Sequence, residues 1–115
     1  DDLDLVLPRD RPAEAFVATV RASVEHPMVA RLARDEPGAA LERLKAGNPS
    51  PLDLSRMYVA AKIRVDVPEA NADELADVLT RLATMYVLVP SPSVDPHDED
   101  AVRAFAKRVL APLLG

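Results

Sequence analysis

The stretch NADELADVLTRLATMYVLV, residues Asn71–Val89, is the longest run in this chain with the apolar period of a helix. Asn71 followed three residues later by Glu74 is a capping-box pattern, which predicts that a helix begins at Ala72. At about 100° per residue, the apolar side chains cover roughly 200° of the helix, about twice the width that one-sided packing requires. We therefore expect a second packing partner, the simplest being another copy of the chain. The apolar residues of this arc are Leu75, Val78, Leu79, Leu82, Ala83, Met85, Tyr86 and Val89.

The totals indicate one soluble globular domain, residues 1–115, with 49% hydrophobic and 29% charged residues. A net charge of −5, with no Trp and only two Tyr and two Phe, argues against a phosphate-binding or base-stacking surface. The absence of cysteine excludes disulfides and thiolate chemistry. No apolar run approaches the roughly 20 residues of a membrane helix, and the acidic start DDLDLVLPRD is unlike a targeting signal. We expect a cytoplasmic protein that does not bind membranes.

Prolines divide the first half of the chain into short helices. The first helix begins near Pro12, with Asp10 or Arg11 as its cap, and ends before Pro27, because proline favours the first turn and breaks a helix interior. Its buried side is expected to carry Phe16, Val17, Val20 and Val24. A second segment, MVARL, stops before Pro37, and a third short helix ends at Gly47, a usual terminator.

A fourth helix follows the turn NPSP, with Ser50 as its cap and Asp53 three residues later. Its apolar stripe is Leu54, Met57, Tyr58 and Ala61, and the helical pattern gives way to an extended link around residues 65–68.

The last helix follows the turn PSPS after Val89 and starts at Asp95 or Asp98. Its apolar residues repeat at three and four: Val102, Phe105, Ala106, Val109, Leu110 and Leu113. No segment alternates with the period of a strand. The sequence therefore predicts an all-α fold of four to six helices, in which the last two pack as an antiparallel hairpin.

The segment ADVLTRLATMYVLVPSPSVDPHDEDAVRAFAKRVLAPLLG (76–115) resembles the C-terminal end of TetR/AcrR-type bacterial transcriptional regulators. The resemblance lies in the long helix, the Pro/Ser turn after Val89, the acidic helix start and the Ala-Pro-Leu-Leu ending. Upstream, Glu25-His26-Pro27 and Asp35-Glu36-Pro37 are similar to the first ligand-domain helix of that family and the break after it. The helix-turn-helix DNA-binding half of the family has no counterpart in this sequence.

The resemblance implies a regulatory domain that dimerises through its last two helices and encloses an apolar effector pocket. Two hairpins would then form a four-helix dimer seam. The residues expected at this homodimer interface are Leu75, Val78, Leu79, Leu82, Tyr86, Val102, Phe105, Val109 and Leu113.

The effector pocket is expected between the helices Phe16–Val24, Leu54–Ala61 and Ala72–Val89. Methionine adapts to irregular apolar shapes and a tyrosine hydroxyl can orient a ligand, so a small apolar or amphipathic molecule fits such a site. Ordinary core packing is the alternative for each residue. The expected lining is Phe16, Val20, Met57, Tyr58 and Met85.

No pattern indicates catalysis, a cofactor or a metal. His97 lies among acidic residues, but these begin a helix, where carboxylates are favoured by the helix dipole. There is no Gly-rich phosphate loop and no nucleophile elbow. Two functions stay open: the effector-binding and dimerisation half of a TetR-like regulator, whose DNA contact belongs to a separate N-terminal unit, and a free-standing helical dimerisation or adaptor protein without a pocket.

Overall fold

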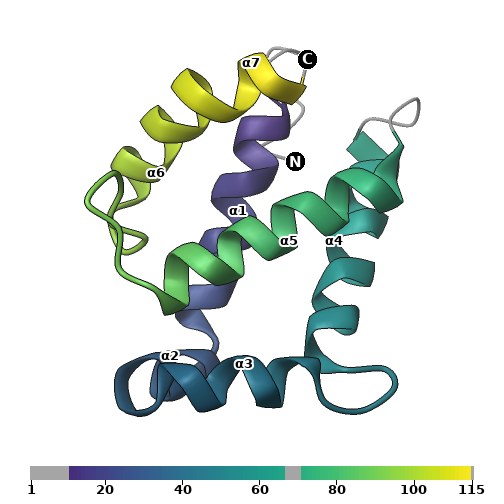
Figure 1. The fold of residues 1–115 in the computed structure, drawn as a ribbon. Coiled ribbons are helices and arrows are strands. Elements are labelled where there is room, and N and C mark those ends of the chain that lie inside the picture. The colour runs from purple at the N-terminus through teal and green to yellow at the C-terminus, as the bar shows by residue number, and fades with distance from the viewer. Residues whose placement is uncertain (1–10, 67–70, 115) are drawn as a thin grey trace.

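The computed structural model describes residues 11–66 and 71–114, and every regular element in these ranges is helical. The expected cap Asp10 and the link at 67–70 lie outside the described residues. Figure 1 shows α5 crossing the molecule in front of α1, with α4 at one edge and α2 and α3 below. The elements are α1 (Arg11–Glu25), α2 (Pro27–Asp35), α3 (Pro37–Lys45), α4 (Pro51–Asp66), α5 (Ala72–Leu88), α6 (Glu99–Phe105), the π-helical segment η3 (Ala106–Leu110) and α7 (Ala111–Leu114).

Side-chain caps begin α4, α5 and α6, as the sequence predicts. The Ser50 hydroxyl accepts from the Asp53 amide at 3.0 Å, and the Asp53 carboxylate accepts from the Ser50 amide at 3.0 Å. Asn71 caps α5 by accepting from the Glu74 amide at 3.3 Å. Of the two candidates for the last helix, Asp98 is the cap, and it accepts from the Ala101 amide at 3.1 Å. Each cap satisfies an amide that has no partner inside its helix.

The main core forms where α1 and α4 pack on α5. Leu79 and Ala83 of α5 are fully buried, and Phe16, Val17 and Val20 of α1 lie against them in the same cluster. A smaller cluster, made of Leu32, Ala40, Leu44 and Leu88, holds α2 and α3 against the C-terminal end of α5. The helix predicted at Ala72–Val89 is therefore the central element of the fold.

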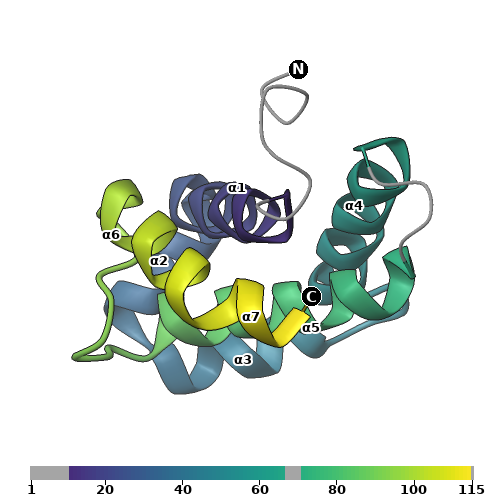
Figure 2. The same ribbon diagram turned by 90° about the horizontal axis from the view of Figure 1, so that it is seen from above.

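The C-terminal helices do not form the direct hairpin that the sequence predicts. The segments α6, η3 and α7 pack chiefly on α1, as Figure 2 also shows from above. They meet α5 through the rings of Phe105 and Tyr86, whose centroids are 5.2 Å apart. The physical reason is that the buried side of α5 is already occupied by α1 and α4, so α1 offers the remaining apolar surface.

Helix α4 packs through a different face from the one predicted. Val59, Ala60 and Ile63 are buried in the main core. The predicted stripe is on the opposite side, where Met57 and Tyr58 are 54% and 63% exposed. Because α4 is apolar on both sides, periodicity alone does not decide which face is buried. The helix also continues to Asp66, past the point at which an extended link was expected.

Candidate functional site

The nine residues predicted at a dimer seam divide into two classes in the structure. Leu79, Val102 and Phe105 are buried inside the single chain, so they cannot contact a partner without unfolding. The others are accessible: Val78 and Val109 are exposed, and Leu75, Leu82 and Tyr86 are half-buried. The Leu113 side chain lies outside the described residues. The accessible α5 residues of the predicted set therefore lie along the outer edge of that helix, and its centre is buried in the core.

Accessible apolar residues of α5, with the C-cap residue after it, form a row that we call the α5 outer row: Val78, Leu82, Met85 and Val89. They follow one another at four, three and four residues, the spacing of one helix face. Val78, Met85 and Val89 are 42%, 49% and 51% exposed, and Leu82 is half-buried. Met85 was predicted as a ligand residue, and Val89 was left out of the predicted seam although it belongs to the same apolar arc.

An aromatic cluster next to the α5 outer row connects α5 to α1 and to the C-terminal helices. Tyr86 follows Met85 on α5, and its ring meets Phe16 at 6.5 Å and Phe105 at 5.2 Å, both edge to face. Phe16 and Phe105 themselves lie 6.4 Å apart. Such edge-to-face pairs add about 0.5–1.5 kcal/mol to the burial of the rings. The cluster fixes α1, α5 and α6 relative to one another, so the accessible edge of α5 lies on a rigid support.

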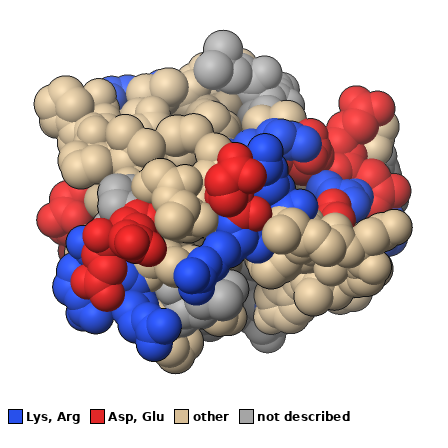
Figure 3. Space-filling model, turned by 60° about the horizontal axis from the view of Figure 1, so that its bottom comes forward, with Lys and Arg blue, Asp and Glu red and all other residues tan. Residues whose placement is uncertain are grey.

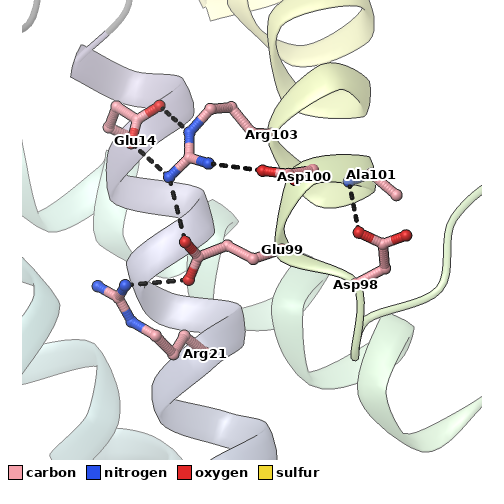
Figure 4. Close-up of polar contacts among 7 residues, drawn as sticks. All are labelled: Glu14, Arg21, Asp98, Glu99, Asp100, Ala101 and Arg103. Atoms are coloured by element: carbon pink, nitrogen blue, oxygen red, sulfur yellow. Dashed lines mark hydrogen bonds and ion pairs between the residues drawn. The ribbon is translucent and has the colours of Figure 1, made fainter.

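Charged side chains close the other side of the α1–α6 contact (Figure 4). The Arg103 guanidinium donates to both carboxylate oxygens of Glu14, from Nε at 2.7 Å and from Nη2 at 3.2 Å. Arg103 also reaches Glu99, which accepts from Arg21 at 3.0 Å. The hydrogen bond to Glu14 raises the pKa of Arg103 above its ordinary value, with a smaller contribution from Glu99. This network links residues 89 positions apart, and nothing in the local sequence pattern indicates it.

The five residues predicted to line an effector pocket are not brought together in this chain. Phe16 and Val20 are 1% and 2% exposed and fill the main core. Met57, Tyr58 and Met85 are on the surface, with about half or more of each side chain exposed. Phe16 and Val20 are therefore explained by ordinary core packing, which was the alternative for each residue of the set.

A half-open groove of about 160 Å³ lies between α1 and the start of α6. Valines form its floor, and Arg21, Glu25, His97 and Glu99 form its rim. Of the predicted ligand residues only Val20 borders it. The groove is close in size to a cavity that holds one benzene ring. The valines at its floor present little surface to the groove, because Val17, Val20 and Val102 are each only 2% exposed.

The charged side chains of the described residues are dispersed over several helices. Among the described residues, no three His, Cys, Asp or Glu side chains are grouped as a metal site requires. His97 instead receives support from Asp95, whose carboxylate accepts from the His97 amide at 2.9 Å. On the face drawn in Figure 3, basic and acidic side chains are interspersed and form no broad basic area. None of the described helices combines the length and the apolar character that a bilayer-spanning helix needs.

Comparisons of this chain with protein-family models, with curated proteins and with solved structures found no match. The likeness to TetR-type regulators therefore stays a prediction from the residues quoted above.

Proposed function

We propose that this chain is the dimerisation and effector-binding half of a TetR-like bacterial transcriptional regulator. In this proposal a separate helix-turn-helix unit contacts DNA, and the present domain joins two such units. A small apolar or amphipathic effector would then shift the dimer between two conformations. The proposal is supported by the sequence resemblance over residues 76–115 and by the all-helical fold.

The single observation that carries dimerisation is the exposed apolar α5 outer row. Fully burying a valine or methionine side chain is worth about 1.5–3 kcal/mol, so burying the exposed half is worth roughly 1 kcal/mol per residue. Val78, Met85 and Val89 would thus supply roughly 3 kcal/mol per copy, and a twofold interface counts each contact twice. Association costs about 4–15 kcal/mol, so the roughly 6 kcal/mol from the two copies leaves little or no surplus, and the accessible surface of the C-terminal helices, including Val109, must add to the seam.

Substitution of Met85 by glutamate tests this proposal. The side chain is 49% exposed, so Met85→Glu leaves the core of the single chain intact while it places a carboxylate in the seam. Leu41→Glu is the matched control, because Leu41 is 41% exposed on α3. Light scattering after gel filtration should show a dimer for the unmodified chain and for Leu41→Glu, and a monomer for Met85→Glu. Dimers of equal stability in all three would refute the seam.

The alternative is a helical dimerisation or adaptor protein without an effector. It is favoured by the exposure of Met57 and Tyr58, which leaves the predicted pocket lining divided between core and surface. Native mass spectrometry of the purified chain separates the two functions. A retained small molecule that stabilises the fold supports the regulator, and an unliganded dimer that no apolar compound stabilises supports the adaptor.

A further inference from the structure

The outward face of α4 is a second apolar surface, distinct from the α5 outer row. Leu54, Tyr58, Ala61 and Val65 follow one another at four, three and four residues, and we call them the α4 outer stripe. Leu54, Tyr58 and Val65 are 53%, 63% and 76% exposed, and Ala61 is exposed as well. The stripe lies opposite the buried Val59, Ala60 and Ile63 of the same helix. Helix α4 stands at an edge of the molecule in both ribbon views, where a partner has access.

We propose that the α4 outer stripe pairs with the same stripe of a second copy, with the two helices antiparallel. The spacing of the stripe is that of the paired positions in a coiled coil, which buries one continuous seam between two helices. A self-pairing surface must be complementary to itself after a twofold rotation. The α4 outer stripe meets this requirement only if a large residue of one copy faces a small or medium one of the other.

The antiparallel register provides that match. When the twofold axis passes between Val59 and Ala60, Tyr58 faces Ala61 of the second copy and Leu54 faces Val65. The small side chain of Ala61 leaves room for the ring of Tyr58, and each residue of the stripe finds an apolar partner. Packing of large against small side chains is what gives such helix seams their density.

The charges beside the stripe favour the same register. Lys62 and Arg64 flank the stripe, one on each side, and neither meets its own counterpart in the antiparallel pair. Because the twofold rotation keeps each flank of the stripe on the same side of the seam, Lys62 lies on the same side as Ser55 of the second copy, and Arg64 lies on the same side as Met57. Arg64 is already neutralised by the carboxylate of Asp73 at the start of α5. No like charges are therefore opposed along the seam, although each copy carries a net charge of −5.

The length of the stripe sets the strength of the contact. From Leu54 to Val65 the helix rises about 16 Å, or three turns. Two helices of this length bury less than the roughly 800 Å² per partner of a standard interface. The α4 contact is therefore expected to be the weaker of the two, and it would join dimers formed through α5 into larger assemblies. It does not depend on the α5 seam or on the proposed regulatory function.

Disulfide trapping tests the pairing directly, because the natural chain has no cysteine. In the double variant Leu54→Cys/Val65→Cys, each cysteine faces its partner in the second copy, while the two in one chain are about 16 Å apart, too far for a disulfide. In Leu54→Cys alone, the two cysteines of an antiparallel pair are separated by the same distance. All variants also carry Met85→Glu, so that only the α4 contact is left to bring two copies together.

Mild oxidation at tens of micromolar should convert most of the double variant to covalent dimer and leave the single variant monomeric. Adding Ala61→Glu, which places a carboxylate against Tyr58 at an exposed position, should reduce the dimer yield at least tenfold. Far-ultraviolet circular dichroism checks that every variant is folded. Equal dimer yields from the single and double variants, which a parallel pair or random collision would give, would overturn the proposal. So would the absence of dimer from the double variant, which would leave the stripe to a different protein.

Discussion

Breaking the ion pair between Glu14 and Arg103 should destabilise the fold more than breaking any other ion pair described here. The pair has two hydrogen bonds, and its side chains are only 16% and 30% exposed. Hydrogen bonds between charged groups are worth about 1.5–3 kcal/mol, and the partial exposure reduces this value. We expect a coupling free energy of about 1–2 kcal/mol between the two side chains.

A double-mutant cycle with Glu14→Gln, Arg103→Met and the combined variant measures that coupling by urea unfolding. The pair Arg21–Glu99 is the internal control, because its single contact of 3.0 Å joins side chains that are 48% and 44% exposed. Such exposed pairs contribute about 0.2–1 kcal/mol. Protein concentration must be the same throughout, since self-association raises apparent stability.

For a domain of 115 residues, the loss of 1 kcal/mol lowers the melting temperature by roughly 4 °C. The coupling of Glu14 to Arg103 should also survive in about 0.5 M salt, whereas the coupling of the control pair should vanish. A value below about 0.3 kcal/mol for Glu14–Arg103, or equal values for the two pairs, would contradict the view that this contact fixes α6 on α1.

Four further results are expected. Ser50→Ala should destabilise the fold by about 1 kcal/mol, since it removes the cap of α4. The hydrogen bond from the Ser50 amide holds the pKa of Asp53 below its ordinary 3.8. The stabilisation from this carboxylate is therefore present above pH 3.8 and is lost as the pH falls through the lower pKa of the folded state. Thermal melts across pH should show that Asp53→Asn destabilises the fold at neutral pH and has little effect in stronger acid. Leu79→Ala should cost about 2–5 kcal/mol in urea unfolding, while Val78→Ala, at an exposed position next to it, should cost under 1 kcal/mol. The domain alone should not retain duplex DNA at physiological salt, and salt-sensitive retention in a gel-shift assay would contradict this.

The sequence predicts the helices well, because their ends depend on local chemistry. Pro27 and Pro37 mark the ends of α1 and α2, Pro51 marks the start of α4, and polar caps mark α4, α5 and α6. Gly47, with a positive φ of 91°, follows α3 at the predicted terminator. These signals act within a few residues, so a single sequence is enough to read them.

The packing of the helices could not be predicted in the same way. Helix α4 is apolar on both faces, so its period does not reveal that Ile63 is buried and Tyr58 is exposed. The placement of the C-terminal helices depends on contacts between distant residues, such as Arg103 with Glu14 and Phe105 with Phe16. This difference also affects the design of experiments, because a charge at Leu79 would unfold the chain and would not test the seam.

Self-association through the accessible edge of α5 is the central claim, and sedimentation velocity of the unmodified chain tests it most directly. At tens of micromolar, the chain of 12.4 kDa should sediment with at least twice its own mass. Met85→Glu should shift that boundary to the monomer and leave the circular dichroism spectrum unchanged. A single boundary at the monomer mass for the unmodified chain over this range would contradict the account.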